Sequence, residues 1–334
     1  RSDLERIRQG ALDKGFEVDL DRLVQLDDER KQLLTEQEQM RHEQKNAGKE
    51  IATLDGTAKQ EAIGRMGEVS DRIKTLGEQL RSVVDKLHDI QSRVPMPADP
   101  KVPVGKDDGE NVELKVVGTP TEFDFEPKDH VELGLALGIV DFARASKLAG
   151  SQTYILKGAG ALLELAVLRF ALDLVVGRGF TPMIVPTMVK YEPLFGTAYF
   201  PGGEDQTYEI PQDNLYLTGT SEVPVTAFHS GELLEESQLP IRYAGWSTCY
   251  RREAGAAGRD TKGLYRIHQF NKVEQVIICK NDVEESLEHH EFIRNNAEDI
   301  LQAMEIPYRV VDVCTGDLGV GQVRKFDIEA WMPS

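Results

Sequence analysis

The stretch Thr248–Glu274, TCYRREAGAAGRDTKGLYRIHQFNKVE, decides the fold. Its flanks, Trp246–Arg251 and Ile267–Ile278, have the character of strands, and its middle, Glu253–Gly258, is small and flexible. The stretch therefore predicts two antiparallel strands joined by a basic loop. Guanidinium groups grip phosphate and carboxylate through paired hydrogen bonds, so this loop suits a nucleoside triphosphate. The basic residues of the stretch are Arg251, Arg252, Arg259, Lys262, Arg266 and Lys272.

One face of the second predicted strand carries the chemistry. Side chains two residues apart share a face of a strand, so Arg266, His268, Phe270 and Glu274 are predicted to point the same way. An arginine, an aromatic ring and a carboxylate placed in this way can hold a phosphate, a base and a polar group. A surface hairpin with solvated charges is the competing interpretation, and the residues alone leave both open.

The rest of the chain after residue 100 predicts an α+β fold, an antiparallel sheet flanked by helices. Strand-like and helix-like segments do not alternate in a regular βαβ rhythm, which disfavours a doubly wound sheet. No Walker loop and no strand-linked G-x-G-x-x-G is present. The predicted strands are Ile184–Val185, Leu215–Leu217, Ile241–Ala244 and Val273–Cys279, and the predicted helices are Glu132–Leu148, Gly160–Arg178 and Val283–Met304.

The N-terminal residues predict an antiparallel coiled-coil arm. Apolar residues recur at alternating spacings of three and four from Met66 to Val94, and every seven residues from Leu26 to Leu54. The turn signal Asp55–Thr57 lies between the two stripes. At 1.5 Å per residue the first stripe spans ~42 Å, which is long for a helix inside a globular body.

The arm is predicted to end at a domain boundary. The proline-rich segment Pro95–Pro100 stops any helix, so we assign residues 1–94 to the arm and residues 95–334 to the main body. Most heptad seams only hold helices together, so a dimerisation element, a spacer or a plain coiled-coil scaffold is the simple alternative.

The charge of the chain is unevenly distributed. Its 57 acidic and 39 basic residues give a net charge of -18, of which residues 1–94 contribute only -3. An acidic balance argues against a general nucleic-acid binder, and no DNA partner is expected. No apolar run is long enough to predict a membrane span. The three cysteines form no zinc or disulfide pattern, which suits a reducing cytoplasm.

The motifs resemble those of the seryl-tRNA synthetases of the bacterial type, which are class II aminoacyl-tRNA synthetases. The resemblance covers nearly the whole chain and is most specific at motif 2, within the stretch quoted first. Gly179–Pro186 is similar to motif 1, and Leu217–Val223 to the Thr-x-Glu loop of the family. Val313–Gly319 and Lys325–Trp331 are similar to later core strands. Motif 2 matches at Tyr250–Gly255, Gly258–Thr261, Gly263–Phe270 and Lys272–Glu274.

The resemblance implies a role for each site residue. Thr220 and Glu222 would hold the substrate serine, with Glu222 pairing its α-ammonium, and Glu274 would accept a hydrogen bond from its hydroxyl group. Arg251 would bridge the serine carboxylate and the ATP α-phosphate.

The same resemblance implies an ATP site. Glu253 would contact the adenine amino group, Phe270 would stack on the adenine ring, and Arg266 would hold the terminal phosphates. Arg251 and Arg266 are thus the expected catalytic residues. ATP and Mg²⁺ are the expected cofactors, and no residue of this chain is assigned as a metal ligand.

The resemblance also implies partners. The family charges tRNA(Ser), and tRNA(Sec) where that tRNA exists, and it forms homodimers through motif 1 in the cytoplasm. The chain stops before motif 3 of the family, so we expect it to be truncated at both ends and inactive or nearly so. The alternatives are a regulatory paralogue, which usually loses pocket residues, and an aminoacyl-carrier-protein ligase, which lacks the long arm.

Overall fold

The computed structural model describes residues 3–51, 53–255 and 262–333. The chain forms two compact units. The first runs from the N-terminal residues to Glu110 and includes Cys314–Arg324, and the second comprises Asn111–Val313 and the residues from Lys325 onward. The predicted domains, residues 1–94 and 95–334, stay a prediction.

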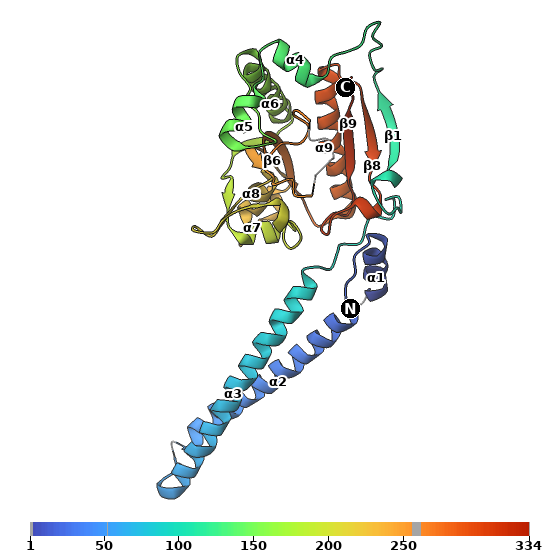
Figure 1. Cartoon of the computed structure of the whole chain (residues 1–334). Coiled ribbons are helices and arrows are strands. Elements are labelled where there is room, and N and C mark those ends of the chain that lie inside the picture. Colours follow the sequence, from blue (N-terminus) through green and yellow to red (C-terminus); the bar gives the residue numbers. More distant parts are fainter. Residues whose placement is uncertain (1–2, 52, 256–261, 334) are drawn as a thin grey trace. The chain divides into compact units, whose positions relative to one another are not determined.

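The first unit is built on a long helical hairpin (Figure 1). The short helix α1, Leu4–Asp13, is followed by α2, Leu20–Ile51, and α3, Gly56–Gln91. Helices α2 and α3 lie side by side and antiparallel, as the two heptad stripes predict. Gly56 has a φ of +60°, a conformation that glycine adopts at no steric cost, so the turn forms where the sequence indicates it.

The predicted seam is the buried face of this hairpin. Every apolar position of the α3 stripe, from Met66 to Val94, is buried or half-buried, and Leu76 is fully buried. A polar residue of α2 also enters the interface: the Gln37 side chain is buried and donates to the Ile73 carbonyl at 3.2 Å. A buried amide costs free energy unless it is hydrogen-bonded, and this bond satisfies it.

The second unit contains three three-stranded sheets among the described residues. The central one joins β2, Thr181–Ile184, β6, Ile241–Tyr250, and β7, Gln269–Ile278. The β6–β7 pair is antiparallel over ten residues, whereas β2 and β6 are parallel. The other sheets are β1, Val112–Val117, with β8, Tyr308–Asp312, and β9, Phe326–Ala330, and β3, Met188–Val189, with β5, Leu215–Leu217, and β4, Tyr208–Ile210.

Helices cover the central sheet. Val175 of α6, Ala159–Gly177, packs with Phe180 and Ala244 in a buried core, and Phe292 of α9, Val283–Ala303, packs against it. A second core packs α7, Tyr191–Gly196, and α8, Glu222–Thr226, with residues of β3 and β5. Its buried residues are Val189, Leu194, Phe200 and Val223. These cores hold β6, β7 and α8 in place, and those elements carry the candidate site.

The prediction of one helix over Glu132–Leu148 is wrong. The segment forms two helices, α4, His130–Ala136, and α5, Phe142–Ala149. Gly138 between them has a φ of +68°, which a helix cannot continue through, and Asp141 caps α5 by accepting from the Arg144 N–H at 3.0 Å. The helices predicted at Gly160–Arg178 and Val283–Met304 are confirmed as α6 and α9.

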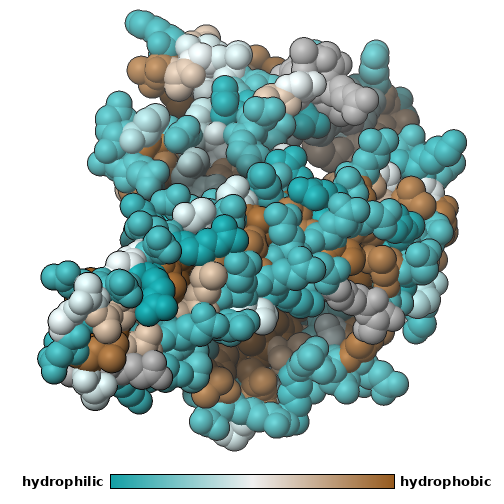
Figure 2. Space-filling model, turned by 90° about the horizontal axis from the view of Figure 1, so that it is seen from below, coloured by the Kyte–Doolittle hydropathy of each residue, from teal (hydrophilic) through white to brown (hydrophobic). Residues whose placement is uncertain are grey.

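The face of the molecule shown in Figure 2 is mostly polar. On the face shown in Figure 2, hydrophilic residues predominate and hydrophobic ones lie in the recesses between them. Within the part of the chain that the structure describes, none of the helices combines the length and the hydropathy that a membrane crossing requires.

Candidate active site

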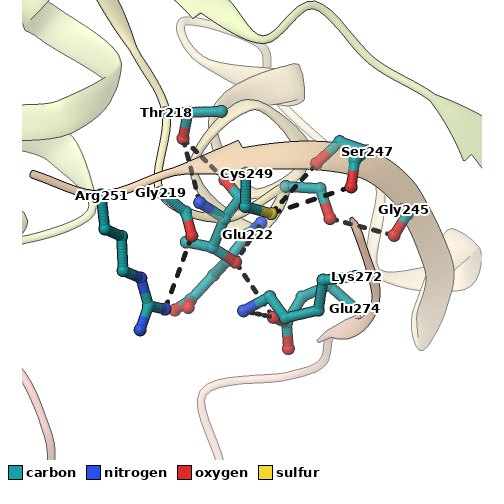
Figure 3. Close-up of polar contacts among 11 residues, drawn as sticks. Thr218, Gly219, Glu222, Gly245, Ser247, Cys249, Arg251, Lys272 and Glu274 are labelled. Atoms are coloured by element: carbon teal, nitrogen blue, oxygen red, sulfur yellow. Dashed lines mark hydrogen bonds and ion pairs between the residues drawn. The ribbon is translucent and has the colours of Figure 1, made fainter. Parts of the chain in front are cut away.

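The loop Thr218–Ser221 lies against strands β6 and β7, and the side chains of Glu222, Arg251, Lys272 and Glu274 gather beside it (Figure 3). We refer to the space among these four side chains as the recess. The loop is fixed by its own polar groups: the Thr218 hydroxyl donates to the Thr220 carbonyl at 2.7 Å, and the Ser221 hydroxyl donates to the Gly245 carbonyl at 2.9 Å. A Cβ at Gly245 would lie 2.8 Å from the Ser221 oxygen, so only glycine lets the loop approach β6 this closely.

Thr220 and Glu274 meet directly. The Thr220 hydroxyl donates to Oε2 of Glu274 at 3.0 Å and accepts from the backbone N–H of Glu222 at 3.2 Å. Its only proton is therefore committed to Glu274, and toward a ligand it has only a lone pair to offer. The predicted serine-binding residues thus share one hydrogen-bonded cluster, although they lie more than 50 residues apart in sequence.

Glu222 projects into the same recess (Figure 3). The residue is exposed to solvent, but neighbouring protein atoms displace enough water around the carboxylate to disfavour its charge. Among the described residues its carboxylate makes no hydrogen bond or ion pair. Burial raises the pKa of Glu222, the charge of Glu274 raises it further, and Lys272 lowers it. Such a carboxylate is stabilised by any cation that enters the recess.

Arg251 lies between the loop and the aromatic ring predicted to hold adenine. Its guanidinium carbon is 5.1 Å from the centroid of the Phe270 ring, and its Nη2 reaches the Gly219 carbonyl at 3.5 Å. The backbone of Arg251 is fixed by a 3.0 Å bond from its N–H to the His268 carbonyl. Its Nε is buried without a hydrogen-bond partner in the described structure, so this donor is available to an anion.

Glu253 and Arg266 form an ion pair that the sequence did not predict. Nη1 of Arg266 donates to Oε2 of Glu253 at 2.7 Å, and both side chains are largely shielded from solvent. Glu253 adopts a φ of +51°, an uncommon conformation for a residue with a side chain. Nε of Arg266, like that of Arg251, is buried without a partner among the described residues. The two residues therefore belong to one cluster, next to the Arg251 backbone.

One prediction about the second strand is wrong. Strand β7 begins at Gln269, so Arg266 and His268 precede it and do not follow its alternation. Phe270 and Glu274 remain on one face of β7, with Lys272 between them. The reason is a tertiary contact: the His268 N–H bonds to the Gln152 carbonyl at 3.0 Å instead of joining the β6–β7 ladder.

Several residues that position the basic loop were missed. The Gln206 side chain exchanges two hydrogen bonds with the Ala254 backbone, at 2.9 and 3.2 Å. On the side of the loop that leads into β7, Lys262 pairs with Asp129, and Nε2 of His130 accepts from the Leu264 N–H at 3.0 Å. No pattern in the sequence links these distant positions. The predicted motif residues Gly258–Thr261, including Arg259, lie outside the described residues.

A resident metal site is not evident in the part of the chain that the structure describes, where no three histidine, cysteine or acidic residues converge. The orphaned Nε donors of Arg251 and Arg266 suit an anion instead. The chemistry of the donor set therefore fits the phosphates of a nucleotide, and it fits a metal ion only as a companion of those phosphates.

The comparisons with known proteins agree with this geometry. Residues 207–334 match the family described as "tRNA synthetase class II core domain (G, H, P, S and T)", and residues 1–97 match "Seryl-tRNA synthetase N-terminal domain". The antiparallel hairpin with its arginine-rich loop and the matched core define a class II aminoacyl-tRNA synthetase fold.

Two similar proteins indicate which family within this class the chain resembles. The chain is 43% identical to the serine–tRNA ligase of Deinococcus radiodurans over 334 residues, covering 100% of this chain and 79% of that protein. It is 44% identical to the serine–tRNA ligase of Rubrobacter xylanophilus over 338 residues, covering 100% of this chain and 78% of the relative.

The solved seryl-tRNA synthetase of Pyrococcus horikoshii, complexed with ATP, superimposes with a TM-score of 0.88 at 38% identity, covering 100% of this chain and 80% of that one. The chain belongs to the seryl-tRNA synthetase family. The predicted family and the predicted α+β class are confirmed.

Proposed function

We propose that this site joins serine to ATP, forming seryl-adenylate, and that the seryl group then passes to tRNA(Ser); the expectation that the 334-residue chain alone is nearly inactive stays a prediction, which serine-dependent pyrophosphate exchange would test. The observation that carries the proposal is the polarity of the recess. Thr220, Glu222 and Glu274 present only hydrogen-bond acceptors to a ligand, since the Thr220 proton is already donated to Glu274.

Free serine matches these acceptors. Its α-ammonium has three N–H donors and a positive charge, which Glu222 and the Thr220 lone pair would receive. Its hydroxyl would donate to Oε1 of Glu274, because Oε2 is already bound by Thr220 and Lys272. Alanine would leave this acceptor unpaired in a partly buried site, and such a mismatch can cost a factor of up to ~10⁴ in selectivity.

Arg251 would act on the first reaction step. A serine carboxylate oxygen attacks the α-phosphorus of ATP in line, the bond to the bridging oxygen breaks, and pyrophosphate leaves. The carboxylate and the α-phosphate repel each other, and one guanidinium between them stabilises their approach. The unpaired Nε of Arg251 supports this role. The unpaired Nε of Arg266 likewise supports its proposed role at the terminal phosphates.

The second step needs no protein nucleophile. A ribose hydroxyl at the end of the tRNA attacks the activated carbonyl, its proton is released, and AMP leaves. Phe270 would stack on adenine, and Glu253 would accept from the adenine amino group. Mg²⁺ would neutralise phosphate charge as a companion of ATP.

The helical hairpin is the proposed tRNA-binding arm. Its far end carries the exposed basic side chains of Arg41, Lys45, Lys49 and Arg65. Double-stranded RNA is recognised largely by shape and by its backbone, which a long arm with a few cations can follow. We propose that the arm contacts the variable stem of tRNA(Ser), and of tRNA(Sec) where that tRNA exists.

A homodimer through motif 1 is also proposed. The apolar residues Leu162, Leu163 and Leu165 of α6 are exposed, at 68%, 63% and 51%, and Ile184 of β2 is 89% exposed. An exposed apolar face of this kind typically marks a protein interface. Because the three cysteines form no disulfide and the proposed substrates are cytoplasmic, we place the protein in the cytoplasm.

The alternatives are less well supported. A regulatory paralogue usually loses pocket residues, whereas Thr220, Glu222 and Glu274 form an intact cluster. A carrier-protein ligase lacks the long arm, whereas α2 and α3 form one here.

The pocket can be tested by equilibrium binding. We would titrate non-hydrolysable seryl-, alanyl- and threonyl-sulfamoyl adenosine into the protein by calorimetry. The seryl compound is expected to bind at least ~100-fold more tightly than the alanyl compound. Equal affinity for the two would refute serine selection. Aminoacylation of total tRNA with each amino acid tests the reaction, and charging with an amino acid other than serine would refute the role of Glu274.

A further inference from the structure

Lys272 occupies a position in the recess to which the resemblance gives no role. It lies on β7 between Phe270 and Glu274 and pairs with Ser247 across the ladder. Its Nζ forms an ion pair with Oε2 of Glu274. The Lys272 and Glu274 side chains are only 30% and 25% exposed, so solvent screens this pair less than it screens a surface pair. Figure 3 shows the pair on the same side of the sheet as Arg251.

Two donors converge on one oxygen of Glu274. The Thr220 hydroxyl donates to Oε2 at 3.0 Å, and the Lys272 ammonium pairs with the same Oε2. Oε1 has no partner among the described residues. A carboxylate held at one oxygen by two groups on different elements cannot rotate freely, because rotation would break both contacts. The free oxygen is therefore presented in a fixed direction.

Two carboxylates and one ammonium group lie close together in the recess. Glu222 on α8 and Glu274 on β7 are both carboxylates, and the charge of Glu274 disfavours the ionised form of Glu222. Lys272 is the cation that opposes this effect at Glu222, where it lowers the pKa that burial and Glu274 raise. Arg251, on the β6 side, is directed at the Gly219 carbonyl and the Phe270 ring.

We infer that Lys272 is a positioning residue for serine selection. Its ammonium fixes which Glu274 oxygen faces the serine hydroxyl, and it offsets the negative charge that Glu222 and Glu274 share. This inference rests on the proposed function. It adds that recognition of the hydroxyl depends on a lysine that does not touch the substrate.

The role predicts a specific loss. Without Lys272, Glu274 keeps only the Thr220 donor, so its free oxygen is no longer held toward the hydroxyl. Binding of a seryl ligand should weaken, whereas binding of an alanyl ligand, which has no hydroxyl, should change little. Discrimination between the two should therefore fall. A lysine that only stabilised the fold would affect both ligands and ATP alike.

The experiment uses the whole chain and three variants. Lys272→Met removes the charge at similar length, Lys272→Arg keeps it, and Lys280→Met is the matched control, since Lys280 pairs with Glu236 outside the recess. Calorimetry measures seryl- and alanyl-sulfamoyl adenosine and ATP from pH 5.5 to 8.5. Circular dichroism compares the folded content, and Lys272→Gln replaces the methionine variant if that variant does not fold.

For Lys272→Met at pH 8 we expect the seryl compound to bind about 10-fold more weakly, and the alanyl compound and ATP to change less than about twofold. At acidic pH the loss of affinity should begin at a higher pH for both aminoacyl compounds, because both carry the ammonium that Glu222 receives and Lys272 no longer lowers the Glu222 pKa. Lys272→Arg should retain most of the selectivity, and Lys280→Met should match the parent chain.

Two results would overturn the inference. One is seryl binding by Lys272→Met equal to that of the parent chain with the same pH profile. The other is a parallel loss for the seryl compound, the alanyl compound and ATP. If the parent chain itself does not prefer the seryl compound, the proposed function fails and the inference fails with it. If the parent prefers it and the variant does so equally, only the inference fails.

Discussion

Thr220→Val removes a hydroxyl at constant shape from the centre of the recess. Thr220 is only 2% exposed, and its oxygen makes the 3.0 Å bond to Glu274 and accepts the 3.2 Å bond from the Glu222 N–H. Leaving a buried donor unpaired costs about 1–3 kcal/mol, so we expect the free energy of unfolding to fall by about that amount. The loss should appear as a lower midpoint in urea.

The same change should weaken ligand binding. The Thr220 lone pair is a proposed acceptor for the serine ammonium, and a hydrogen bond to a charged group is worth about 1.5–3 kcal/mol, or a factor of about 10–100 in affinity. Calorimetry with seryl-sulfamoyl adenosine measures it. Thr315→Val is the control, since this equally buried hydroxyl donates to the Gly105 carbonyl and accepts from the Gly105 N–H, and its loss should lower stability without changing affinity. Affinity of Thr220→Val within twofold of the parent would refute the assignment of this acceptor.

Three further predictions concern pH and packing. The raised pKa of Glu222 means that affinity for the seryl ligand, which requires the ionised carboxylate, is present at high pH and lost as the pH falls; Glu222→Gln should remove this acid limb in pH-dependent calorimetry. Leu76→Ala should destabilise the helical hairpin by about 2–5 kcal/mol in thermal unfolding, whereas Val84→Ala on the exposed face should cost far less. Burial lowers the pKa of Lys14 from 10.5 to about 8. Between these pH values the unfolded chain binds more protons than the folded chain, so the free energy of unfolding should rise with pH. Denaturant titrations at each pH should show this rise for the parent chain and not for Lys14→Met.

The helical hairpin could be predicted because its signal is local and repetitive. The α3 stripe from Met66 to Val94 and the α2 stripe from Leu26 follow the helix period over many turns, so chance matches are excluded by length. The turn was equally readable, since Gly56 takes the positive φ that a glycine in a turn signal suggests.

The partnerships within the site could not be predicted in the same way. Thr220 and Glu274 were assigned to one ligand through the family resemblance, but their direct hydrogen bond depends on how the loop before α8 packs on β6. Nothing in the sequence indicates that Arg266 pairs with Glu253, or that Lys272 and Thr220 share one Glu274 oxygen. When a side chain could reach several partners, the tertiary structure decides which one it contacts. The local hydrophobic periodicity of the sequence carries no information about that contact.

The two wrong predictions of secondary structure also arise from contacts between residues distant in the sequence. Helix propensity and spacing favour a continuous helix over Glu132–Leu148, but Gly138 takes a positive φ and Val140 forms a bridge with Leu156. The strand pattern before Gln269 is real in the sequence, yet the His268 N–H finds the Gln152 carbonyl. In each case one long-range backbone bond outweighs a weak local preference.

The Arg266–Glu253 pair bears on how tightly ATP can bind. The proposed roles give Arg266 a phosphate and Glu253 the adenine amino group, so binding must exchange the 2.7 Å bond between them for two new ones. The bond between Arg266 and Glu253 is charge-assisted, and so are the bonds to ATP that would replace it. Only the difference in free energy between the old bond and the new bonds therefore contributes to ATP affinity. The pair also keeps both charges satisfied when no nucleotide is bound, and it holds the base of the basic loop together. The residues that would bind ATP thus stabilise the site beforehand, and their strength as ligands is correspondingly moderate.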